Sequence, residues 1–529
     1  MVILGLEAGL QEAAIEENLK QFLLVLSLAL TVAGLPQMLG RASQIPYTLA
    51  LVMVGLVLAL LDVRLVDLSP ALILLIFLPP LLFEAAWNLQ WAALKRYFLP
   101  IVLYATLGVL VAIAGITFGL NHFAGLSLST ALLIGASLSA TDPVAVTALF
   151  RELGVSRRAS TIMEGESLFN DGMAVVAFGF LVATATSLTT LQVQPIVLEL
   201  VTVVGIGVAV GLIIGFGISF LTQRFDLPLV EQSLTLVAAY ATYLIAEDLG
   251  GSGVIATVTA GLILGNFGSR IGMSPRTRVL VSEFWEFLAF FINSLVFLLV
   301  GDQIHFDSLI DNLGLIALTI VGMLVSRAIA IYGLGLLSNK LGNLELPIAE
   351  KTILWWGGLR GTVSIALALS IPINLPERDK VIAIVFGAVL FTLLVQGLTI
   401  QPLLKALNLL GDQPLRQQYI ELMARQTALS RVLEYLPTIE SRPGVDPEFC
   451  RYQTSLLKGE IDQIAVTVER LLDEHPNLRE YMNERLQEEL FAVEVDTYAK
   501  LVRAGQLTRE LSPLLEEMHH RTPEIQEQS

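Results

Sequence analysis

The sequence predicts an all-α polytopic membrane protein that crosses the membrane about thirteen times and ends in a soluble helical tail. Hydrophobic residues make up 54% of the 529 residues and charged residues only 15%, whereas soluble domains carry about a quarter charged residues. The mean hydropathy is +0.71. Polarity is also unevenly distributed, because apolar runs continue to about Asn408 and charge density rises from Gly411 onward.

Thirteen apolar runs are long enough to cross about 30 Å of hydrocarbon. They lie at 20–40, 46–63, 70–87, 98–119, 127–150, 160–185, 195–222, 228–248, 252–268, 280–301, 308–337, 345–372 and 379–405. Residues 1–19 hold four glutamates and no Lys or Arg, whereas a signal peptide begins with basic residues. We therefore expect a short extracytoplasmic N-terminus at 1–19, a transmembrane domain at 20–410 and an acidic cytoplasmic tail at 411–529.

Basic residues in the loops predict the orientation, because cytoplasmic loops carry an excess of Lys and Arg. With the N-terminus outside, twelve basic residues fall on the inner side and four on the outer side. The inner residues are Arg41, Lys95, Arg96, Arg151, Arg157, Arg158, Arg224, Arg270, Arg276, Arg278, Lys340 and Lys405. The outer residues are Lys20, Arg64, Arg378 and Lys380. The short loops favour a bacterial inner membrane, with a thylakoid or archaeal membrane left open.

The sixth apolar run carries an unusual density of acids. Residues 161–174 read TIMEGESLFNDGMA and include Glu164, Glu166 and Asp171. A carboxylate at the centre of a membrane helix costs on the order of 2.5–3.5 kcal/mol on insertion scales. The sequence therefore predicts a polar cavity inside the membrane domain, occupied by an ion or a proton.

Helical spacing divides this run into two neighbouring faces. Ser167 and Asp171 are four residues apart on one face, and Glu166 and Asn170 are four apart on the next. One pair can form an ion site while the other supports it.

Two further acids lie nearer the cytoplasmic ends of their runs. Glu164 either receives ions from the inner side or is a solvated acid at a helix start. Glu84, within FLPPLLFE, either lines an inner ion funnel or extends to the membrane interface.

The fifth run has Asp142 directly before Pro143. Proline lacks an N–H and its ring interrupts the helical hydrogen bonds. Broken backbone at membrane depth is tolerated only where it is buried in protein or lines a cavity. Freed carbonyls, with Thr141 and Ser139, can then bind a small hard cation; the alternative is an ordinary proline kink.

Two arginines lie within later runs and each requires a carboxylate partner. Arg360 is flanked by glycines in WWGGLRGTVSIALAL, which predicts an irregular helix. Glu166 is its expected partner, because the neighbouring aspartate must stay free to bind and release its ligand. We expect Arg327 to form a second buried cluster with Glu283 and Glu286, either for transport or as a fixed brace.

Four segments together resemble the NhaP-type monovalent cation/proton antiporters, a branch that also contains the animal sodium/proton exchangers. They are ATDPVAV at 140–146, GESLFNDG at 165–172, FWEFLAFFINSLVFLLVG at 284–301 and GGLRGTVSIALAL at 357–369. The resemblance spans nearly the whole membrane part and does not extend into the tail. It implies two inverted six-helix repeats around a linking seventh span, with spans 5 and 12 broken and crossed. It also implies a homodimer in which a core moves like an elevator, although no internal sequence repeat is visible.

The same resemblance implies roles for individual residues. Asp171 would alternately hold a cation or a proton. Three residues would supply further Na⁺ ligands: Thr141, Asp142 and Ser167. Asn170 stands where electrogenic relatives carry a second aspartate. Glu166 and Arg360 match the family's structural ion pair, and Glu84 matches a residue that guides ions.

These residues predict Na⁺/H⁺ exchange by competition of cation and proton for Asp171. Because Asn170 cannot ionise, one exchangeable charge favours electroneutral one-for-one exchange, although Asp142 is a second nearby carboxylate. Oxygen ligands suit Na⁺ or Li⁺ and leave a K⁺/H⁺ antiporter open. We expect no cofactor besides the transported ions.

Other classes fit less well. A cation channel usually has a repeated ring of residues or a carbonyl-lined filter loop, and no TVGYG-like loop is present. An intramembrane aspartyl protease would use Asp142 and Asp171 as a dyad, which leaves Pro143 and Arg360 without a role. There is no HExxH motif. The net charge of −16 argues against nucleic acid as a partner.

The tail carries 22 acidic and 13 basic residues from position 411 onward. Periodic apolar segments at 415–435, 453–473 and 479–503 predict helices, and 436–449 is rich in helix breakers. The tail either senses pH or binds a partner through its acidic surface and three histidines, or is a stabilising appendage. Those histidines are His475, His519 and His520. Its partner cannot be named from the sequence, and the single Cys450 excludes an intrachain disulfide.

Overall fold

The structure is a computed structural model that describes most of the chain. The described residues are 20, 22–35, 46–61, 69–186, 193–223, 227–342, 346–375, 377–410, 413–440 and 445–475, with single helical positions between 478 and 497. The predicted N-terminal segment 1–19, the histidines at 519 and 520 and most of the third tail segment lie outside them. The chain divides into two compact units, 1–409 and 410–529.

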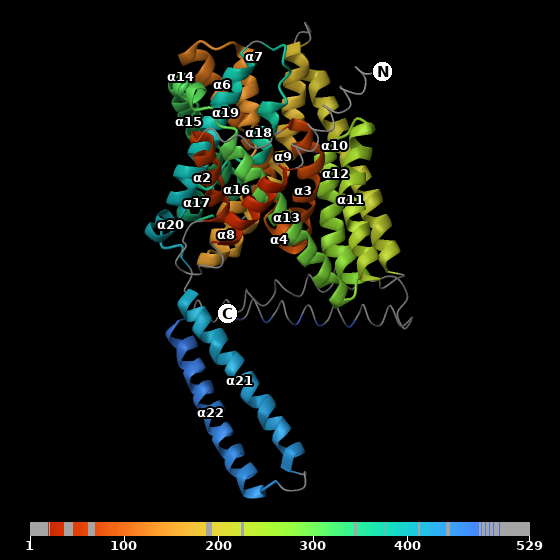
Figure 1. Ribbon diagram of the computed structural model, residues 1–529, viewed down its shortest axis with the longest axis vertical. Coiled ribbons are helices and arrows are strands. Elements are labelled where there is room, and N and C mark those ends of the chain that lie inside the picture. Colours follow the sequence, from red (N-terminus) through yellow and green to blue (C-terminus); the bar gives the residue numbers. More distant parts are fainter. Residues whose placement is uncertain are drawn as a thin grey trace, which may run out of the picture. The chain divides into compact units, whose positions relative to one another are not determined.

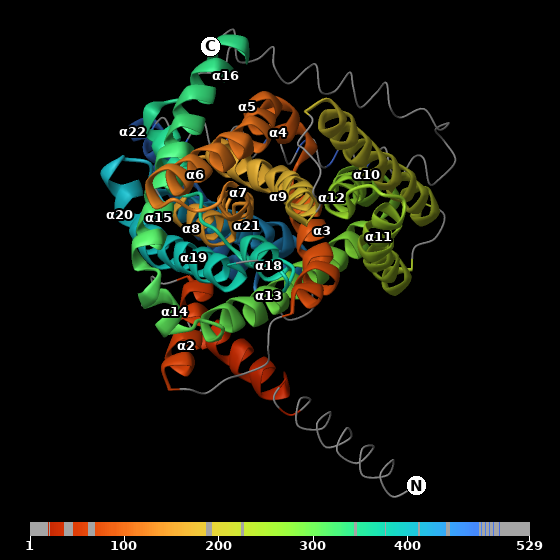
Figure 2. The same ribbon diagram turned by 90° about the horizontal axis from the view of Figure 1, so that it is seen from above.

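The first unit is a bundle of helices, several of which contain short π-helical stretches (Figures 1 and 2). Its described elements are the helix 22–35, α2 (Tyr47–Leu60), η2 (Leu72–Phe77), α3 (Leu78–Asn88), α4 (Trp91–Arg96), α5 (Phe98–Leu103), η3 (Tyr104–Gly108), α6 (Val109–Ala124), α7 (Leu128–Ser137), α8 (Val144–Leu153), α9 (Arg157–Thr186), α10 (Val193–Thr222), α11 (Pro228–Asp248), α12 (Gly253–Ile263), η4 (Leu264–Gly272), α13 (Pro275–Asp302), α14 (Phe306–Asp311), α15 (Leu313–Ala328), η5 (Ile329–Leu334), α16 (Gly335–Gly342), α17 (Ile348–Trp356), α18 (Thr362–Leu369), α19 (Arg378–Phe391), η6 (Thr392–Gln396) and α20 (Gly397–Ala406).

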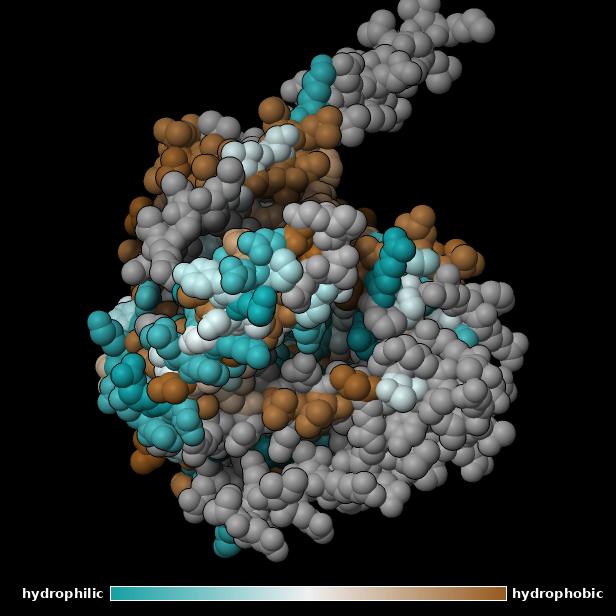
Figure 3. Space-filling view, turned by 90° about the horizontal axis from the view of Figure 1, so that it is seen from below, coloured by the Kyte–Doolittle hydropathy of each residue, from teal (hydrophilic) through white to brown (hydrophobic). Residues whose placement is uncertain are grey.

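The helices agree with the predicted membrane class. Among the described residues, seven helices are long and apolar enough to cross a membrane, and five shorter apolar helices accompany them. Each of the thirteen predicted runs overlaps one or more helical segments of the described residues. Large apolar side chains such as Leu24, Ile213 and Phe220 are exposed on the surface, where hydrophobic residues appear in several groups (Figure 3). The all-helical membrane class is confirmed, while the number of crossings stays a prediction.

Two of the predicted runs are broken, as the sequence indicated. The fifth consists of α7 and α8, separated by unwound residues around Pro143, and the twelfth consists of α17 and α18, separated around Arg360. The two breaks meet directly, because the backbone N–H of Asp142 donates to the carbonyl of Leu359 at 2.8 Å. We call this meeting point the crossing. It lies in the interior of the bundle, between α9 and α19 (Figure 2).

In a different region, at one edge of the bundle, the helices α10, α11 and α12 lie side by side (Figures 1 and 2). We call this region the panel. Gly207, Gly211 and Gly215 follow each other at four-residue intervals on α10 and contact α12. Small residues at this spacing allow two helix backbones to approach closely. The panel is therefore held together by continuous helices in close contact.

The second unit contains a helical hairpin of α21 (Gln413–Glu440) and α22 (Pro447–Glu474). Tyr419, Leu471 and Leu478 form its small apolar core, and Arg425 forms an ion pair with Glu460. α21 continues through Pro437, so it ends later than the breaker-rich segment at 436–449 predicted. The first two predicted tail segments are helical.

Candidate cation site

At the crossing, three of the predicted site residues, Thr141, Ser167 and Asn170, are hydrogen-bonded to one another. The Ser167 hydroxyl of α9 donates to the Thr141 carbonyl. The Asn170 side-chain amide donates to Thr141 Oγ1 at 2.7 Å, and its oxygen accepts from the Thr141 N–H at 3.3 Å. All three residues are buried. The intact helix α9 therefore holds the broken end of α7 through one side chain from each of its two neighbouring polar faces.

The two aspartates at the crossing differ in their partners. Asp142 Oδ1 accepts the N–H of Val144 at 3.0 Å, at the start of α8. Asp171 Oδ1 is buried and has no hydrogen-bond partner among the described residues. The charged groups that act on Asp171 are Asp142 and Arg360. Asp171 therefore has a buried oxygen with free hydrogen-bonding capacity, and its role as the group that holds a proton or a cation stays a prediction.

Glycine makes room for this arrangement. A Cβ on Gly361 would lie only 2.7 Å from Asp142 Cγ, a distance that real Cβ atoms do not adopt. The glycine at the break in the twelfth run thus leaves the space that the Asp142 side chain of the fifth run occupies.

The predicted Glu166–Arg360 ion pair is corrected by the structure. Glu166 Oε1 instead pairs with Arg327 Nη1 at 2.9 Å, with side chains only 4% and 8% exposed. Arg327 also donates to the carbonyls of Trp355 at 3.1 Å and Leu354 at 2.8 Å. Arg327 reaches Glu166 because α15 lies against α17, where these carbonyls anchor its guanidinium.

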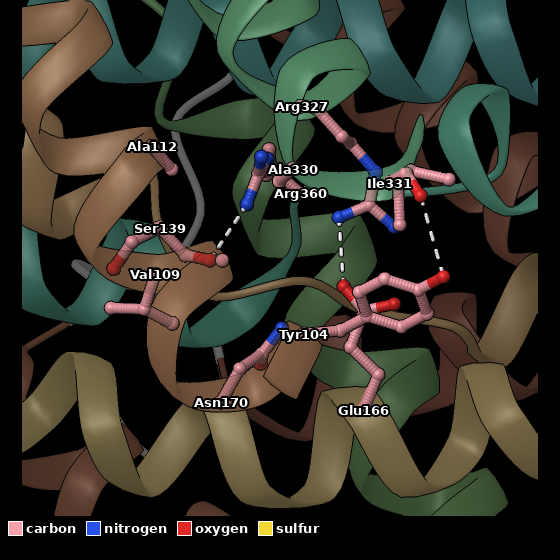
Figure 4. Close-up of a pocket in the computed structure, with 11 residues that line it drawn as sticks. Tyr104, Val109, Ala112, Ser139, Glu166, Asn170, Arg327, Ala330, Ile331 and Arg360 are labelled. Atoms are coloured by element: carbon pink, nitrogen blue, oxygen red, sulfur yellow. Dashed lines mark hydrogen bonds and ion pairs between the residues drawn. The ribbon is translucent and has the colours of Figure 1, made fainter. Parts of the chain in front are cut away.

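Arg360 binds backbone carbonyls rather than a carboxylate (Figure 4). Its Nη1 donates to the carbonyls of Ser139 and Ala140, both at 2.8 Å. These carbonyls belong to the unwound residues that follow α7, where helical partners are lost. A cation near a helix C-terminus is favoured by the helix dipole. Arg360 therefore supplies hydrogen bonds to backbone carbonyls at the break. The sequence analysis did not predict this, because it considered only carboxylates as partners for the arginine.

The predicted cluster of Arg327 with Glu283 and Glu286 is also corrected, because Arg327 is committed to Glu166 and both glutamates are exposed on α13. Glu286 acts electrostatically on Glu84 instead, together with Glu164. The Glu84 carboxylate accepts a hydrogen bond from Asn88, and Glu164 pairs with Arg151 at 3.0 Å. Acids from α3, α9 and α13 thus gather in one neighbourhood.

Tyr47 and Asn293 were missed by the sequence analysis. The Tyr47 hydroxyl lies within reach of the Asn293 side chain and within electrostatic range of Asp142 and Glu84. Its ring packs against Phe290 with centroids 5.3 Å apart. Tyr47 is therefore near both Glu84, the single acid of α3, and Asp142 at the crossing. Asn293 carries a sequence signal, because it is the only amide side chain in the apolar sequence FLAFFINSLVFLLVG.

Chemically, the site offers carboxylate, hydroxyl, amide and carbonyl oxygens. Such ligands suit hard cations. Within the described residues, no cluster of three His, Cys, Asp or Glu side chains has the arrangement of a metal centre.

Comparison with known proteins gives consistent matches. Residues 23–406 match the protein family described as "Sodium/hydrogen exchanger, transmembrane". The Na⁺/H⁺ antiporter ApNhaP of Aphanothece halophytica is 57% identical over 514 residues, covering 97% of this chain and 99% of that protein. The low-affinity Na⁺/H⁺ antiporter NhaS1 of Synechocystis sp. is 53% identical over 509 residues, covering 96% and 97%.

A solved structure has the same fold. The sodium proton antiporter MjNhaP1 of Methanocaldococcus jannaschii aligns with a TM-score of 0.60 at 22% identity. The alignment covers 74% of this chain and all of that chain, 100%. At this identity the likeness concerns the fold alone. It extends over the membrane unit rather than the whole chain.

Proposed function

The chain belongs to the sodium/hydrogen exchanger family, and from this premise we propose that it is a secondary antiporter that exchanges Na⁺ for H⁺ across a membrane. The observation that carries the proposal is Asp171, whose buried Oδ1 has no hydrogen-bond partner among the described residues. It lies beside Asp142 and the oxygens of the crossing. The names of the relatives, which are Na⁺/H⁺ antiporters, support the same exchange.

Competition for one carboxylate is the proposed mechanism. A proton on Asp171 removes the charge that attracts a cation, and a bound cation excludes the proton. A bare carboxylate in a low-dielectric site is costly in free energy. The core that carries the empty, charged site would therefore rarely move between the two sides of the membrane. The protonated and cation-bound sites are nearer to neutral and can move, which enforces exchange rather than leak.

Charge counting favours electroneutral one-for-one exchange. Asn170 is an amide, and its hydrogen bonds with Thr141 hold it in place. Arg327 neutralises the Glu166 charge through a buried ion pair. We propose that Asp142, whose Oδ1 accepts the backbone N–H of Val144, keeps one protonation state throughout the cycle. Asp171 is then the one group that exchanges a bound proton for a bound cation during the cycle.

Na⁺ is the proposed cation, with Li⁺ as a second substrate. Thr141, Asp142, Ser167 and Asp171 would supply oxygen ligands once the hydrogen bonds among them open. K⁺ is the alternative within the same class, since selectivity depends on cavity size and field strength.

The larger cycle is proposed from the family and the crossing. We propose thirteen membrane spans in a bacterial inner membrane. The N-terminus would lie outside the cell and the C-terminal tail in the cytoplasm. Two inverted repeats would place the broken helices in a core that moves like an elevator against a dimer domain. The acids Glu84, Glu164 and Glu286 would attract cations on the cytoplasmic side, and Tyr47 lies near both Glu84 and Asp142.

A channel and an intramembrane protease are the rivals from other classes. A channel would conduct without a proton gradient, whereas exchange saturates and stops when the gradient collapses. A protease would cleave membrane peptides and would need both aspartates in contact. The hydrogen bonds of Thr141 and the Arg327–Glu166 pair have no function in either rival.

Everted membrane vesicles from cells without their own sodium/proton antiporters test the proposal. A pH-sensitive dye reports the respiration-driven proton gradient while NaCl, LiCl or KCl is added in turn. We expect Na⁺ to dissipate the gradient and Asp171→Asn to abolish this response. Dissipation by KCl alone would support the alternative. No response to any cation from acidic to alkaline pH, even after removal of the tail beyond Gly411, would contradict antiport.

A further inference from the structure

A small cavity lies beside the crossing (Figure 4), and Thr141 and Asp142 are not among the residues that line it. The volume open to a water-sized sphere is about 20 Å³. Its polar lining comes from Tyr104, Ser139, Glu166, Asn170, Arg327 and Arg360. A cavity of about 10–15 Å³ on this measure is enough for one water molecule.

Two π-helical stretches form the apolar wall. η3 contributes Tyr104 and Gly108, η5 contributes Ala330 and Ile331, and the two stretches pack against each other. Gly108 and Ala330 are small, so little fills the space between the widened turns. π-Helical turns occur often at functional sites in proteins. The cavity therefore follows from local backbone geometry.

Two residues that line this cavity each have a buried polar atom without a hydrogen-bond partner among the described residues. These atoms are Glu166 Oε2, an acceptor, and Arg360 Nε, a donor. The residues are 3% and 1% exposed. Leaving a buried polar group unpaired costs about 1–3 kcal/mol. One molecule that both donates and accepts would satisfy both atoms at once.

We propose that the cavity binds an ordered water molecule that bridges Glu166 Oε2 and Arg360 Nε. The inference rests on the proposed function only for its effect on transport. A cation is excluded because two guanidinium groups line the space, and the free Glu166 oxygen and the small volume disfavour an anion. The water accepts a hydrogen bond from the Nε–H of Arg360 and donates one to Glu166 Oε2.

The bridge links the two arginines of the site through one carboxylate. Arg327 holds Glu166 directly at 2.9 Å, and the water extends that link to Arg360, which holds the Ser139 and Ala140 carbonyls. Ser139 and Asn170 also line the cavity and offer the water a third partner. The expected Glu166–Arg360 pair is thus formed through water, and it positions the broken end of α7.

An experimental structure at a resolution that shows ordered water is the direct test. We expect density about 2.7–3.2 Å from both Glu166 Oε2 and Arg360 Nε. Direct contact between the two side chains, or an empty cavity, would overturn the proposal. This result does not depend on transport, so it separates the water site from the proposed function.

Variants at Ala330 test the consequence for exchange. Ala330→Leu fills the cavity and should slow Na⁺-driven proton exchange about tenfold, while Ala330→Ser leaves room for water and should stay within about twofold. Ala317→Leu, at an exposed position of α15, is the matched control for adding the same side chain. Normal exchange by a folded Ala330→Leu protein would contradict the bridge. If that variant does not fold, the structure of the unchanged protein decides.

Discussion

The crossing and the panel both depend on glycine, but for different reasons. At the crossing, Gly361 leaves space for the Asp142 carboxylate, and Gly358 leaves space for the Arg327 guanidinium. In the panel, Gly207 and Gly211 bring the backbone of α10 against the backbone of α12. The first use of glycine accommodates ionisable side chains and the second brings two helices together.

This difference suggests that the crossing takes part in exchange and that the panel supports the fold. The crossing has unwound backbone, buried arginines and an aspartate with an unpartnered oxygen. The panel consists of continuous helices whose close contacts involve backbone and small or apolar side chains. Substitutions at the crossing should therefore impair exchange before they impair folding. Substitutions in the panel should reduce exchange only through the amount of folded protein.

The largest effect is expected from Gly361→Ala. The added Cβ would meet Asp142 at Cγ, 2.7 Å away, so one of the two breaks must shift. A displacement of about 1 Å in a functional site can cost about 100-fold. We expect at least that loss of Na⁺-driven proton exchange in vesicles, with protein still present in the membrane. Exchange within a few-fold of the unchanged protein would show that the close approach is unimportant.

Arg327→Gln should have the next largest effect, and it acts on stability as well. Removing one partner of a buried ion pair costs about 3–5 kcal/mol, because the remaining charge is left uncompensated. Thermal unfolding of the detergent-purified protein should show a marked decrease in Tm. The double variant Glu166→Gln with Arg327→Gln removes both charges and should recover part of the loss. An equal Tm for the single and double variants would contradict the ion pair.

In the panel, Gly211→Ala should destabilise the protein by about 1–3 kcal/mol through overpacking. Its Cβ would lie 2.6 Å from Thr259 Cβ on α12. Gly205→Ala on the same helix is the matched control, because nothing lies within 4 Å of its Cβ. Thermal unfolding should lower Tm for the first variant only, with exchange per folded molecule unchanged in both. A specific loss of exchange in Gly211→Ala would place function in the panel.

The smallest effect is expected at Glu377, before α19. A hydrogen bond from Lys380 at 2.8 Å holds the pKa of this carboxyl below its usual range, and Thr130 of α7 donates a second bond at 3.2 Å. The stability from the ionised form is present above the unfolded pKa, about 4.3, and is lost as pH falls through the folded value. An exposed pair contributes up to about 1 kcal/mol. Glu377→Gln should lower Tm slightly at neutral pH, and the gap should close on acidification. A gap that is unchanged in acid would contradict this linkage.

Much of this architecture could be predicted from the sequence because membrane helices leave a strong local signal. The apolar runs indicated the helices, and Pro143 with the glycines around Arg360 indicated the two breaks. Asp171 stood out because an acid inside an apolar run needs a reason. These features depend on neighbours in the chain, which a sequence displays.

The partners of the arginines could not be predicted in the same way. Glu166 had two candidate arginines, and only the packing of α15 against α17 decides for Arg327. Arg360 bonds to carbonyls that become available when α7 ends, and backbone acceptors leave no signal in side-chain chemistry. Glu283 and Glu286 are exposed rather than buried. Their spacing along α13 shows which residues share a helix face, but it does not show what that face packs against.

The central claim is that Na⁺ and a proton compete for Asp171 at the crossing. The most direct measurement is proton release when NaCl is added to the purified protein in weakly buffered solution, since a cation that displaces a bound proton must release it. We expect release of about one proton per protein near the pH at which the site is half protonated, and none from Asp171→Asn. Equal release from the folded Asp171→Asn variant, or Na⁺ binding without any release, would contradict the account.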